Sequence, residues 1–192
     1  MTVLSDQDIG RELAYGDLDV SPVDLDEQLQ PASLDIRLGD VFGVYEFPEE
    51  KKHIDVREDD IDEFLVEKEI GEEGWFVVEP DKFYLANTKE EISIPDYLEA
   101  ELMGRSSLAR LGIEIHQTAG LFDPGFSDSD GVLEITNVLG KPVKLYTGMR
   151  IGQLVFKRLE SRSNNPYNSD DNKYQGQKGA QASKIQQDFH DS

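Results

Sequence analysis

Hydrophobic and polar residues alternate in short runs along most of this chain, and turn-forming residues separate the runs. In one of the clearest runs, Leu34, Ile36 and Leu38 alternate with polar residues before Gly39. A period of two is typical of a β-strand with one buried face. The pattern predicts strands at 32–38, 75–78, 83–86, 91–94, 99–103, 113–117, 132–136, 143–146 and 151–156.

The residues between these runs are those that tight turns require. Four connections carry them: Pro95-Asp96, Asp123-Pro124-Gly125, Gly140-Lys141-Pro142 and Thr147-Gly148. Proline, glycine and aspartate each favour a change of chain direction. Many short strands with regular turns and few helices predict a mainly β fold, either a barrel or a sandwich.

Two short segments have a helical pattern instead. At 5–14, Ser5 can cap the helix and Asp8 occupies the capping-box position. At 107–111 a single helical turn is expected inside the β region, with Gly112 as its C-terminal cap.

Two segments lie outside the strand pattern. Residues 46–74, the acidic segment, are densely charged with few apolar residues, and we interpret them as an exposed, variable insertion in a single domain at 1–160. A polar tail follows at 161–192, and its composition is typical of a mobile end. Four of its side chains are nevertheless suited to stacking and hydrogen bonding: Tyr167, Lys173, Tyr174 and Gln177. A mobile end and a lid that folds over a ligand both stay open.

Composition limits the classes of partner. At 192 residues with 38% hydrophobic content, the chain can build one sizeable core. The 40 acidic and 19 basic residues give a formal net charge of −21. A field of that sign repels nucleic-acid backbones, so DNA or RNA is not an expected partner. The plain interpretation of the charge is solubility, as in a high-salt cytoplasm. An anionic nucleotide would bind only where basic residues cluster or a metal ion helps.

The chain has no cysteine, which excludes disulfides and thiolate metal sites. No apolar run approaches the length of a membrane span, and the first residues lack the pattern of a signal peptide. We therefore expect a cytoplasmic protein with no membrane partner.

Basic and hydroxyl side chains gather at the start of the predicted helical turn. Free backbone N–H groups at such a start favour anions, and guanidinium and hydroxyl groups add charge-assisted hydrogen bonds. This arginine–serine turn is a candidate triphosphate cradle, although an N-capped surface turn with solvated arginines explains the same residues. It consists of Arg105, Ser106, Ser107 and Arg110.

A carboxylate lies inside the predicted strand 132–136. Alternation places Val132, Glu134 and Thr136 on one face and the apolar Leu133 and Ile135 on the other. Glu134 either points to solvent or faces a pocket. In a pocket, loss of water around the carboxylate favours the neutral acid and suits it to proton transfer.

Three other residues invite a functional interpretation, each with a structural alternative. Asp123 is either a turn former or a carboxylate that accepts a hydrogen bond from a sugar hydroxyl. The Gln153 amide, inside an apolar strand, bonds either a ligand or a backbone group. His116 in the strand 113–117 is interpreted as structural, and the sequence lacks H-x-x-x-H and H-E-x-x-H spacing, so no zinc site is expected.

The chain strongly resembles the dCTP deaminase family, a branch of the dUTPase-like superfamily of trimeric β-folds. The motifs that carry the resemblance are separated and in order: 30–39 (QPASLDIRLG), 104–110 (GRSSLAR), 116–123 (HQTAGLFD), Leu133-Glu134, 148–154 (GMRIGQL), Pro166-Tyr167 and 173–177 (KYQGQ). The acidic segment lies outside them. The resemblance implies a distorted β-barrel with a short N-terminal helix, assembled as a homotrimer with active sites between subunits.

The resemblance also implies a reaction, the zinc-independent hydrolytic deamination of the cytosine ring of dCTP. Glu134 matches the family's general acid and base, Ser106 and Arg110 help hold it and the attacking water, and the backbone near Ala119 contacts that water. Asp123 would bind the 3′-hydroxyl, and Gln153 would reach the nucleotide from a neighbouring subunit. Mg²⁺ would accompany the triphosphate without a dedicated protein cage. Other implied substrate contacts are Arg105, Ser107, Leu108, Ala109, Val132, Leu133, Tyr167, Lys173 and Gln177.

One motif bears on the product. Family members that also remove pyrophosphate, and so release dUMP, tend to carry glycine and an apolar residue after the motif alanine, as Gly120 and Leu121 do here. Two departures from the family pattern accompany this match: Leu121 stands where an aromatic residue is common, and Asp128-Ser129-Asp130 lengthens the loop before Glu134 by one residue. We therefore expect a dUMP-forming enzyme. A purely deaminating enzyme, a dUTP diphosphatase and a catalytically silent nucleotide-binding module remain as alternatives.

Overall fold

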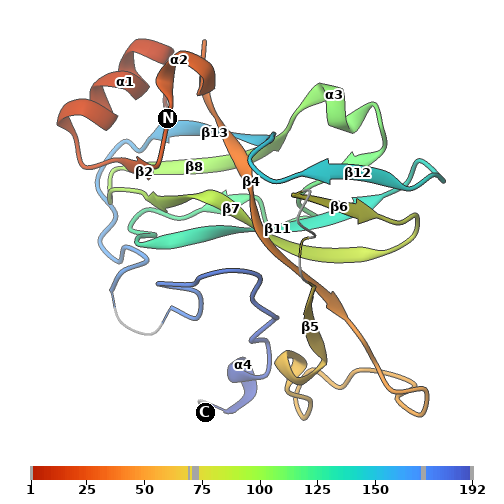
Figure 1. Ribbon diagram of the computed structural model, residues 1–192. Coiled ribbons are helices and arrows are strands. Elements are labelled where there is room, and N and C mark those ends of the chain that lie inside the picture. Colours follow the sequence, from red (N-terminus) through yellow and green to blue (C-terminus); the bar gives the residue numbers. More distant parts are fainter. Residues whose placement is uncertain (1, 69, 71–73, 170–171, 191–192) are drawn as a thin grey trace.

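The computed structural model describes residues 2–68, 70, 74–169 and 172–190 (Figure 1). This part of the chain is mainly β, as the alternating pattern predicts. Its longer strands are β4 (Ser33–Tyr45), β7 (Phe83–Ser93), β8 (Leu98–Gly104), β11 (Ser129–Asn137) and β13 (Arg150–Arg158). The shorter ones are β1 (Thr2–Val3), β2 (Asp19–Ser21), β3 (Leu29–Gln30), β5 (Leu65–Lys68), β6 (Trp75–Val78), β9 (Ile113–Glu114), β10 (Leu121–Phe122) and β12 (Val143–Tyr146). The helices are α1 (Asp6–Tyr15), α2 (Leu25–Gln28), α3 (Ser106–Ala109), α4 (Gln187–His190) and the 3-10 helix η1 (Ile61–Phe64).

Strand β4 organises the sheet because it belongs to both halves of it. Its first part pairs with β13, with Leu34 opposite Leu154, and its second part pairs with β7, with Val44 opposite Tyr84. One half of the sheet therefore runs β10–β8–β13–β4 and the other β4–β7–β11–β9. Figure 1 shows β8 and β13 in one layer and β7 and β11 in the other, with β4 crossing between them. The sheet thus curls toward the distorted barrel that was expected.

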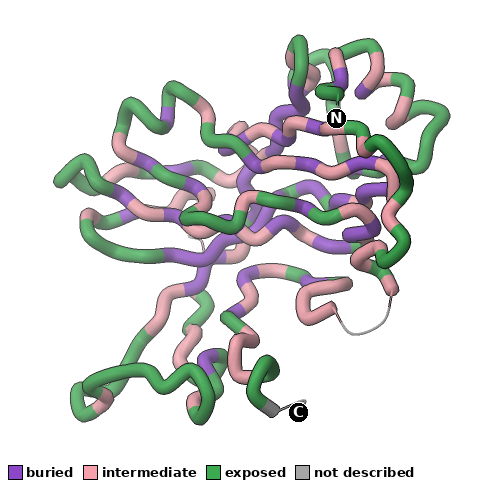
Figure 2. Tube along the Cα trace, turned by 180° about the vertical axis from the view of Figure 1, so that it is seen from behind, coloured by how far each residue is buried: buried purple, intermediate pink, exposed green. Residues whose placement is uncertain are grey.

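The hydrophobic core follows the inner faces of both halves, which appear as buried stretches along the strands in Figure 2. In β11, Leu133 and Ile135 are fully buried while Val132, Glu134 and Thr136 are partly exposed, as alternation predicts. Removing such a side chain from water contributes about 1.5–3 kcal/mol. Strand β11 therefore has one face fixed in the core and one face available to a site.

Helix α1 confirms the capping box. The Ser5 side chain accepts a hydrogen bond from the Asp8 N–H at 3.3 Å, and the Asp8 carboxylate accepts one from the Ser5 N–H at 3.3 Å. The predicted turn at 107–111 begins one residue earlier, because α3 spans Ser106–Ala109. Gly112 follows it with φ +68°, a conformation that favours glycine.

Two strand predictions were wrong. The runs at 83–86 and 91–94 belong to one strand, β7, because the polar residues between them are satisfied inside the protein: Thr88 Oγ1 donates to the Glu90 carbonyl at 2.7 Å, and the Glu90 carboxylate pairs with Arg37 at 2.6 Å. The run at 113–117 is a strand only at β9. After β9, the Gln117 N–H donates to the side chain of Glu134 instead of to a backbone carbonyl. The backbone pairing of β9 with β11 therefore does not extend to Gln117, and His116 lies beyond the strand.

The acidic segment is not uniformly exposed. It contains η1 and β5, and β5 pairs with the end of β4 from Phe42 to Tyr45. Ile61 is buried. Among the described residues, no helix is long and apolar enough to cross a membrane.

Candidate functional site

A cavity of about 590 Å³ opens beside β10 and β11, and the acidic segment and the tail form the rest of its wall. That size lies within the range of small-molecule sites, roughly 300–1,000 Å³. Its sheet residues are Tyr45, Phe83, Leu85, Leu102, Leu121, Phe122, Val132 and Glu134, and Ala119, Asp123 and Phe126 come from the connections. The acidic segment adds Phe47, Ile54, Val56 and Ile61, and the tail adds Tyr167, Tyr174, Gln177, Gln181, Ala182, Ser183 and Ile185. Among the described residues its charged lining consists of two carboxylates.

Glu134 is one of these carboxylates, and its orientation is fixed by the chain that follows β9. The Gln117 N–H donates to Glu134 Oε2 at 2.8 Å, while the Glu134 N–H donates to the Ile115 carbonyl at 3.0 Å. Gln117 is itself held, because its side-chain amide donates to Thr136 Oγ1 at 3.3 Å. The carboxylate is therefore held on the cavity face of β11, where it can exchange protons with a bound molecule.

Asp123 is the other carboxylate, and it follows β10 directly. The turn after it is tied down from two sides: the Gly125 N–H donates to the Ile94 carbonyl at 2.9 Å, and the Tyr167 N–H donates to the Pro124 carbonyl at 2.6 Å. The Tyr167 ring lies 5.9 Å from that of Phe126, and burial raises the pKa of its hydroxyl above the usual value. The start of the tail is thereby joined to the turn that presents Asp123.

The rest of the tail contacts the end of β4 and the acidic segment. The Ser183 N–H donates to the Tyr45 hydroxyl at 3.4 Å, and the Gln186 side-chain amide donates to Asp60 Oδ1 at 3.4 Å. The Arg57 guanidinium lies 5.0 Å from the centre of the Phe189 ring. Figure 1 shows the tail and α4 beside β5 and the acidic segment, below the sheet. Both segments that the sequence places outside the strand pattern thus meet at the cavity.

The arginine–serine turn lies elsewhere. Figure 1 shows α3 on the far side of the sheet from α4, and none of the four residues of the turn lines the cavity. Arg105 pairs with the buried Asp35 at 3.6 Å and donates to the Arg150 carbonyl at 3.2 Å. Arg150 also pairs with Asp35, at 3.2 Å. Burial raises the pKa of Asp35, against the opposing effect of the two guanidinium groups.

The predicted site residues therefore fall into two groups. Within one protomer, the cavity brings together Ala119, Leu121, Asp123, Val132, Glu134, Tyr167 and Gln177. Outside it lie Arg105, Ser106, Ser107, Ala109, Arg110, Gly120, Gln153 and Lys173. Gln153 accepts a hydrogen bond from Ser33 Oγ at 2.9 Å, and Lys173 pairs with Asp188. The side chains of Leu108 and Leu133 are buried in the core.

Sequence reasoning missed the apolar wall of the cavity. Phe47, Ile54, Val56 and Ile61 are separated by charged residues without a regular period, so no strand or helix pattern marked them. Tyr45 was missed because the predicted strand stops at residue 38, whereas β4 continues to Tyr45. The signal available was that several large apolar residues occur in a segment otherwise suited to solvent.

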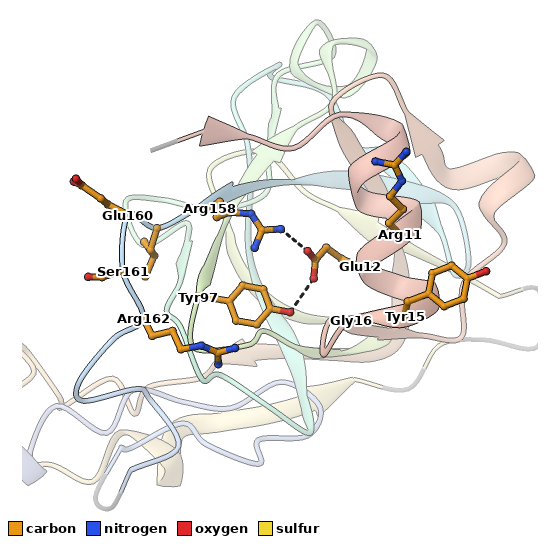
Figure 3. Close-up of a pocket in the computed structure, with 10 residues that line it drawn as sticks. Arg11, Glu12, Tyr15, Gly16, Tyr97, Arg158, Glu160, Ser161 and Arg162 are labelled. Carbon is orange, nitrogen blue, oxygen red and sulfur yellow. Dashed lines mark hydrogen bonds and ion pairs between the residues drawn. The ribbon is translucent and has the colours of Figure 1, made fainter.

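A second hollow of about 480 Å³ lies beside α1 (Figure 3). At its centre the Glu12 carboxylate pairs with Arg158 and accepts a hydrogen bond from the Tyr97 hydroxyl at 2.8 Å. Arg162 pairs with Asp96 at 2.5 Å and lies over the Tyr97 ring. None of the predicted site residues lines this hollow, so the cavity at Glu134 is the candidate site. In the described part of the chain, no group of three or more His, Asp and Glu side chains is arranged to hold a metal ion.

Comparison with known proteins first defines the class of fold. A crystal structure of 2′-deoxycytidine 5′-triphosphate deaminase from Agrobacterium tumefaciens superimposes with a TM-score of 0.63 and 25% sequence identity, over 82% of this chain and 48% of that one. The fold is thus that of a known deoxynucleotide deaminase.

The family follows from sequence. A family model described as dCTP deaminase-like matches residues 3–159. A Haloarcula marismortui protein named dCTP deaminase is 46% identical over 97% of this chain and 96% of its own length. A Methanosphaera stadtmanae protein named dCTP deaminase, dUMP-forming, is 41% identical over 98% of this chain and 96% of its own length. The chain belongs to the dCTP deaminase-like family.

Proposed function

We propose that this protein hydrolyses the cytosine amino group of dCTP and continues to dUMP and diphosphate. The observation that carries the proposal is the Glu134 carboxylate, held by the Gln117 N–H at 2.8 Å on the wall of the cavity, in a chain of this family. The activity in the names of the relatives requires a group that moves protons at a cytosine ring, and Glu134 can supply it.

In the first step, Glu134 takes a proton from water as the water oxygen attacks C4 of the ring. It returns that proton to N3, and then moves the proton of the new C4 hydroxyl to the exocyclic nitrogen. The C4–N bond then breaks, ammonia leaves and a carbonyl forms at C4, so that dCTP and water give dUTP and ammonia. Proton transfer by a positioned side chain contributes typically about 10²–10⁴-fold to such a reaction. In the second step, water cleaves dUTP to dUMP and diphosphate.

A triphosphate needs positive charge, which the described lining of the cavity in one protomer does not supply. Its charged residues are Asp123 and Glu134, whereas Ser106, Ser107 and Arg110 are exposed on the far side of the sheet. We infer a homotrimer in which the arginine–serine turn and Gln153 of a neighbouring subunit complete each site. Ser106 and Arg110 would hold the attacking water and Glu134.

The other contacts follow from the cavity. Asp123, an exposed residue of the lining, would bind the 3′-hydroxyl of the sugar, while Tyr167 and Gln177 would approach the nucleotide from the tail. Mg²⁺ would arrive bound to the triphosphate, since such ions are held largely by substrate phosphates and water. The two lining carboxylates have other roles, so no protein ligand is assigned to the ion. When bound, it would offset phosphate charge.

The dUMP product is favoured by Gly120. A Cβ added to this residue would stand 3.1 Å from the Leu102 carbonyl oxygen, which is closer than ordinary van der Waals contact. The glycine of the dUMP-forming pattern therefore fits its surroundings without strain. The Methanosphaera relative carries the dUMP-forming name, whereas the Haloarcula relative is named for the deamination alone.

The test is incubation of the purified protein with dCTP, dUTP or CTP, each with Mg²⁺, followed by assay of ammonia, diphosphate and nucleotides. We expect dCTP to give ammonia, diphosphate and dUMP in equal amounts. Accumulation of dUTP without diphosphate would remove the second step and leave a purely deaminating enzyme. Absence of ammonia from dCTP would overturn the proposal.

A further inference from the structure

Asp130, at the start of β11, is bonded to the tail through both its backbone and its side chain. Its N–H donates to the Gln177 carbonyl at 2.9 Å, and its own carbonyl accepts from the Gln177 side-chain amide at 3.0 Å. Its carboxylate oxygen Oδ2 accepts from the Gly179 N–H at 2.9 Å. Lys178 Nζ lies 3.5 Å from Oδ1. Three consecutive tail residues are thus held by one aspartate.

The carboxylate is also tied to the sheet. Asn87 Nδ2 donates to Asp130 Oδ2 at 3.2 Å, and Asn87 Oδ1 accepts from the Val41 N–H at 3.1 Å. Because the Val41 bond fixes which end of the Asn87 amide faces which neighbour, the –NH₂ must point to Asp130. The Asp130 side chain is 16% exposed, so these bonds to an ionised group are largely shielded from water. The tail is therefore connected through Asp130 and Asn87 to β7 and β4.

The neighbouring residues continue this contact. The Gly176 N–H donates to Ser129 Oγ at 2.8 Å, and the Gln175 side-chain amide donates to Ser127 Oγ at 2.6 Å. Through Ser127, Ser129 and Asp130, residues 127–130, the anchor loop, therefore hold residues 175–179 of the tail. This is the loop that is one residue longer than the family pattern. The pairing of β11 with β7 is irregular there, between Asp130 and Val132.

Gln177 is the point at which this contact reaches the candidate site. It is 8% exposed and lines the cavity, as Tyr174 and Gln181 on either side of it do. Since both its backbone and its side-chain amide bond the Asp130 backbone, and Gly179 bonds the carboxylate, little freedom is left for Gln177 to move away. The tail is thus held against the cavity by groups of the same protomer.

We propose that Asp130 is a positioning residue, which sets the tail in its closed place and Gln177 at the cavity before the nucleotide arrives. The proposal rests on the proposed function, because its effect is on nucleotide binding. A protein that is already in its binding-competent conformation does not lose affinity to a conformational equilibrium. Without the carboxylate, the two bonds between Gln177 and the Asp130 backbone remain, but Gly179 and Asn87 lose their acceptor. The closed tail then becomes one state among several, and part of the binding energy of the nucleotide is used to close it.

The variants separate loss of the bonds from loss of the charge. Asp130→Ala removes the acceptor for Gly179 and Asn87. Asp130→Asn can place its amide oxygen at the position of Oδ2 and keep both bonds. It loses the negative charge and the ion pair with Lys178, whose ammonium group Glu91 also holds. Asp128→Asn is the matched control: it removes the same charge from an exposed residue two positions away, and asparagine tolerates its φ of +52°.

We expect KM for dCTP to rise about tenfold or more in Asp130→Ala, as when the competent conformation falls to roughly a tenth of its population. Because saturating nucleotide still closes the tail, kcat should stay within about threefold. Asp130→Asn and Asp128→Asn should both stay near the wild-type KM. If Asp130→Ala does not fold, Asp130→Glu keeps the charge, moves the acceptor by one methylene and should also raise KM.

Hydrogen exchange in the nucleotide-free protein gives a readout independent of turnover. Asp130→Ala, or Asp130→Glu in its place, should speed exchange in a peptide covering 175–181 and leave a peptide from β13 unchanged, while both Asn variants match the wild type. If the wild type deaminates dCTP but Asp130→Ala (or Asp130→Glu in its place) changes neither the exchange rate nor KM, the positioning role is overturned. An inactive wild type with the expected exchange pattern would overturn the proposed function and leave the anchoring of the tail standing.

Discussion

Mixing two inactive variants tests whether each active site needs two subunits. Glu134→Gln removes proton transfer from the cavity, and Arg110→Ala removes a guanidinium from the arginine–serine turn on the far side of the sheet. Each variant alone should release little ammonia from dCTP. In a mixed trimer, a site that takes Glu134 from an Arg110→Ala subunit and Arg110 from a Glu134→Gln subunit is intact.

The expected recovery follows from the proposed trimer. A cyclic trimer has three equivalent head-to-tail interfaces, and with equal, random mixing each has a one-half chance of the required subunit on either side. Co-expression of the two variants should therefore restore about a quarter of wild-type ammonia release. Recovery is possible only because the cavity of one protomer contains Glu134 and not the turn.

The matched control mixes Ser106→Ala with Arg110→Ala. Both changes lie on the same turn, so every site in every trimer keeps one defect and activity should stay low. Ammonia release from the Glu134→Gln and Arg110→Ala mixture that is no higher than from either variant would place both residues in one protomer and refute the reasoning.

Two further predictions concern stability. Gly125 has φ +91°, and an added Cβ would stand 2.7 Å from both Pro166 Cβ and the Tyr167 nitrogen, so Gly125→Ala should lower the free energy of unfolding by more than about 1 kcal/mol; an unchanged melting temperature would contradict this. Burial raises the pKa of Asp35, so the folded protein binds this proton more readily than the unfolded chain. The free energy of unfolding of the wild type, compared with Asp35→Asn in denaturant titrations, should therefore rise as the pH falls from 7 toward about 4. A difference that is flat or grows with rising pH would show that the pairing with arginines outweighs burial.

The fold was predictable where local pattern decides it. The short strands β6 and β12 were predicted because turn residues flank them. Alternation in β11 assigned Glu134 to the face opposite the core. Strand β7 was divided in two because Thr88 and Glu90 look like surface residues. Glu90 is buried beside Arg37, 53 positions away in the chain, and a period of two carries no information on such a partner.

The candidate site was predictable only in its parts. The family motifs named Asp123, Glu134 and Gln177, which the cavity brings together. They could not show that the arginine–serine turn lies across the sheet from the cavity of the same protomer, because motifs in order along a chain do not state where their residues lie in the fold. Asp130 was noted only as an extra acid in a loop. Its bond to Gly179 joins residues 49 positions apart, which requires the folded tail to be seen.

The most direct test of the account is ammonia release from dCTP by Glu134→Gln. The glutamine keeps the size of the side chain and an acceptor for the Gln117 N–H, but it does not exchange a proton. Glu114→Gln is the control, because that exposed carboxylate is not among the lining residues of the cavity and accepts a hydrogen bond from Thr136 Oγ1 at 3.1 Å. We expect the rate to fall by about 10²-fold or more in Glu134→Gln with dCTP binding retained, and to be unchanged in the control. Near-normal ammonia release from Glu134→Gln would contradict the role assigned to this carboxylate.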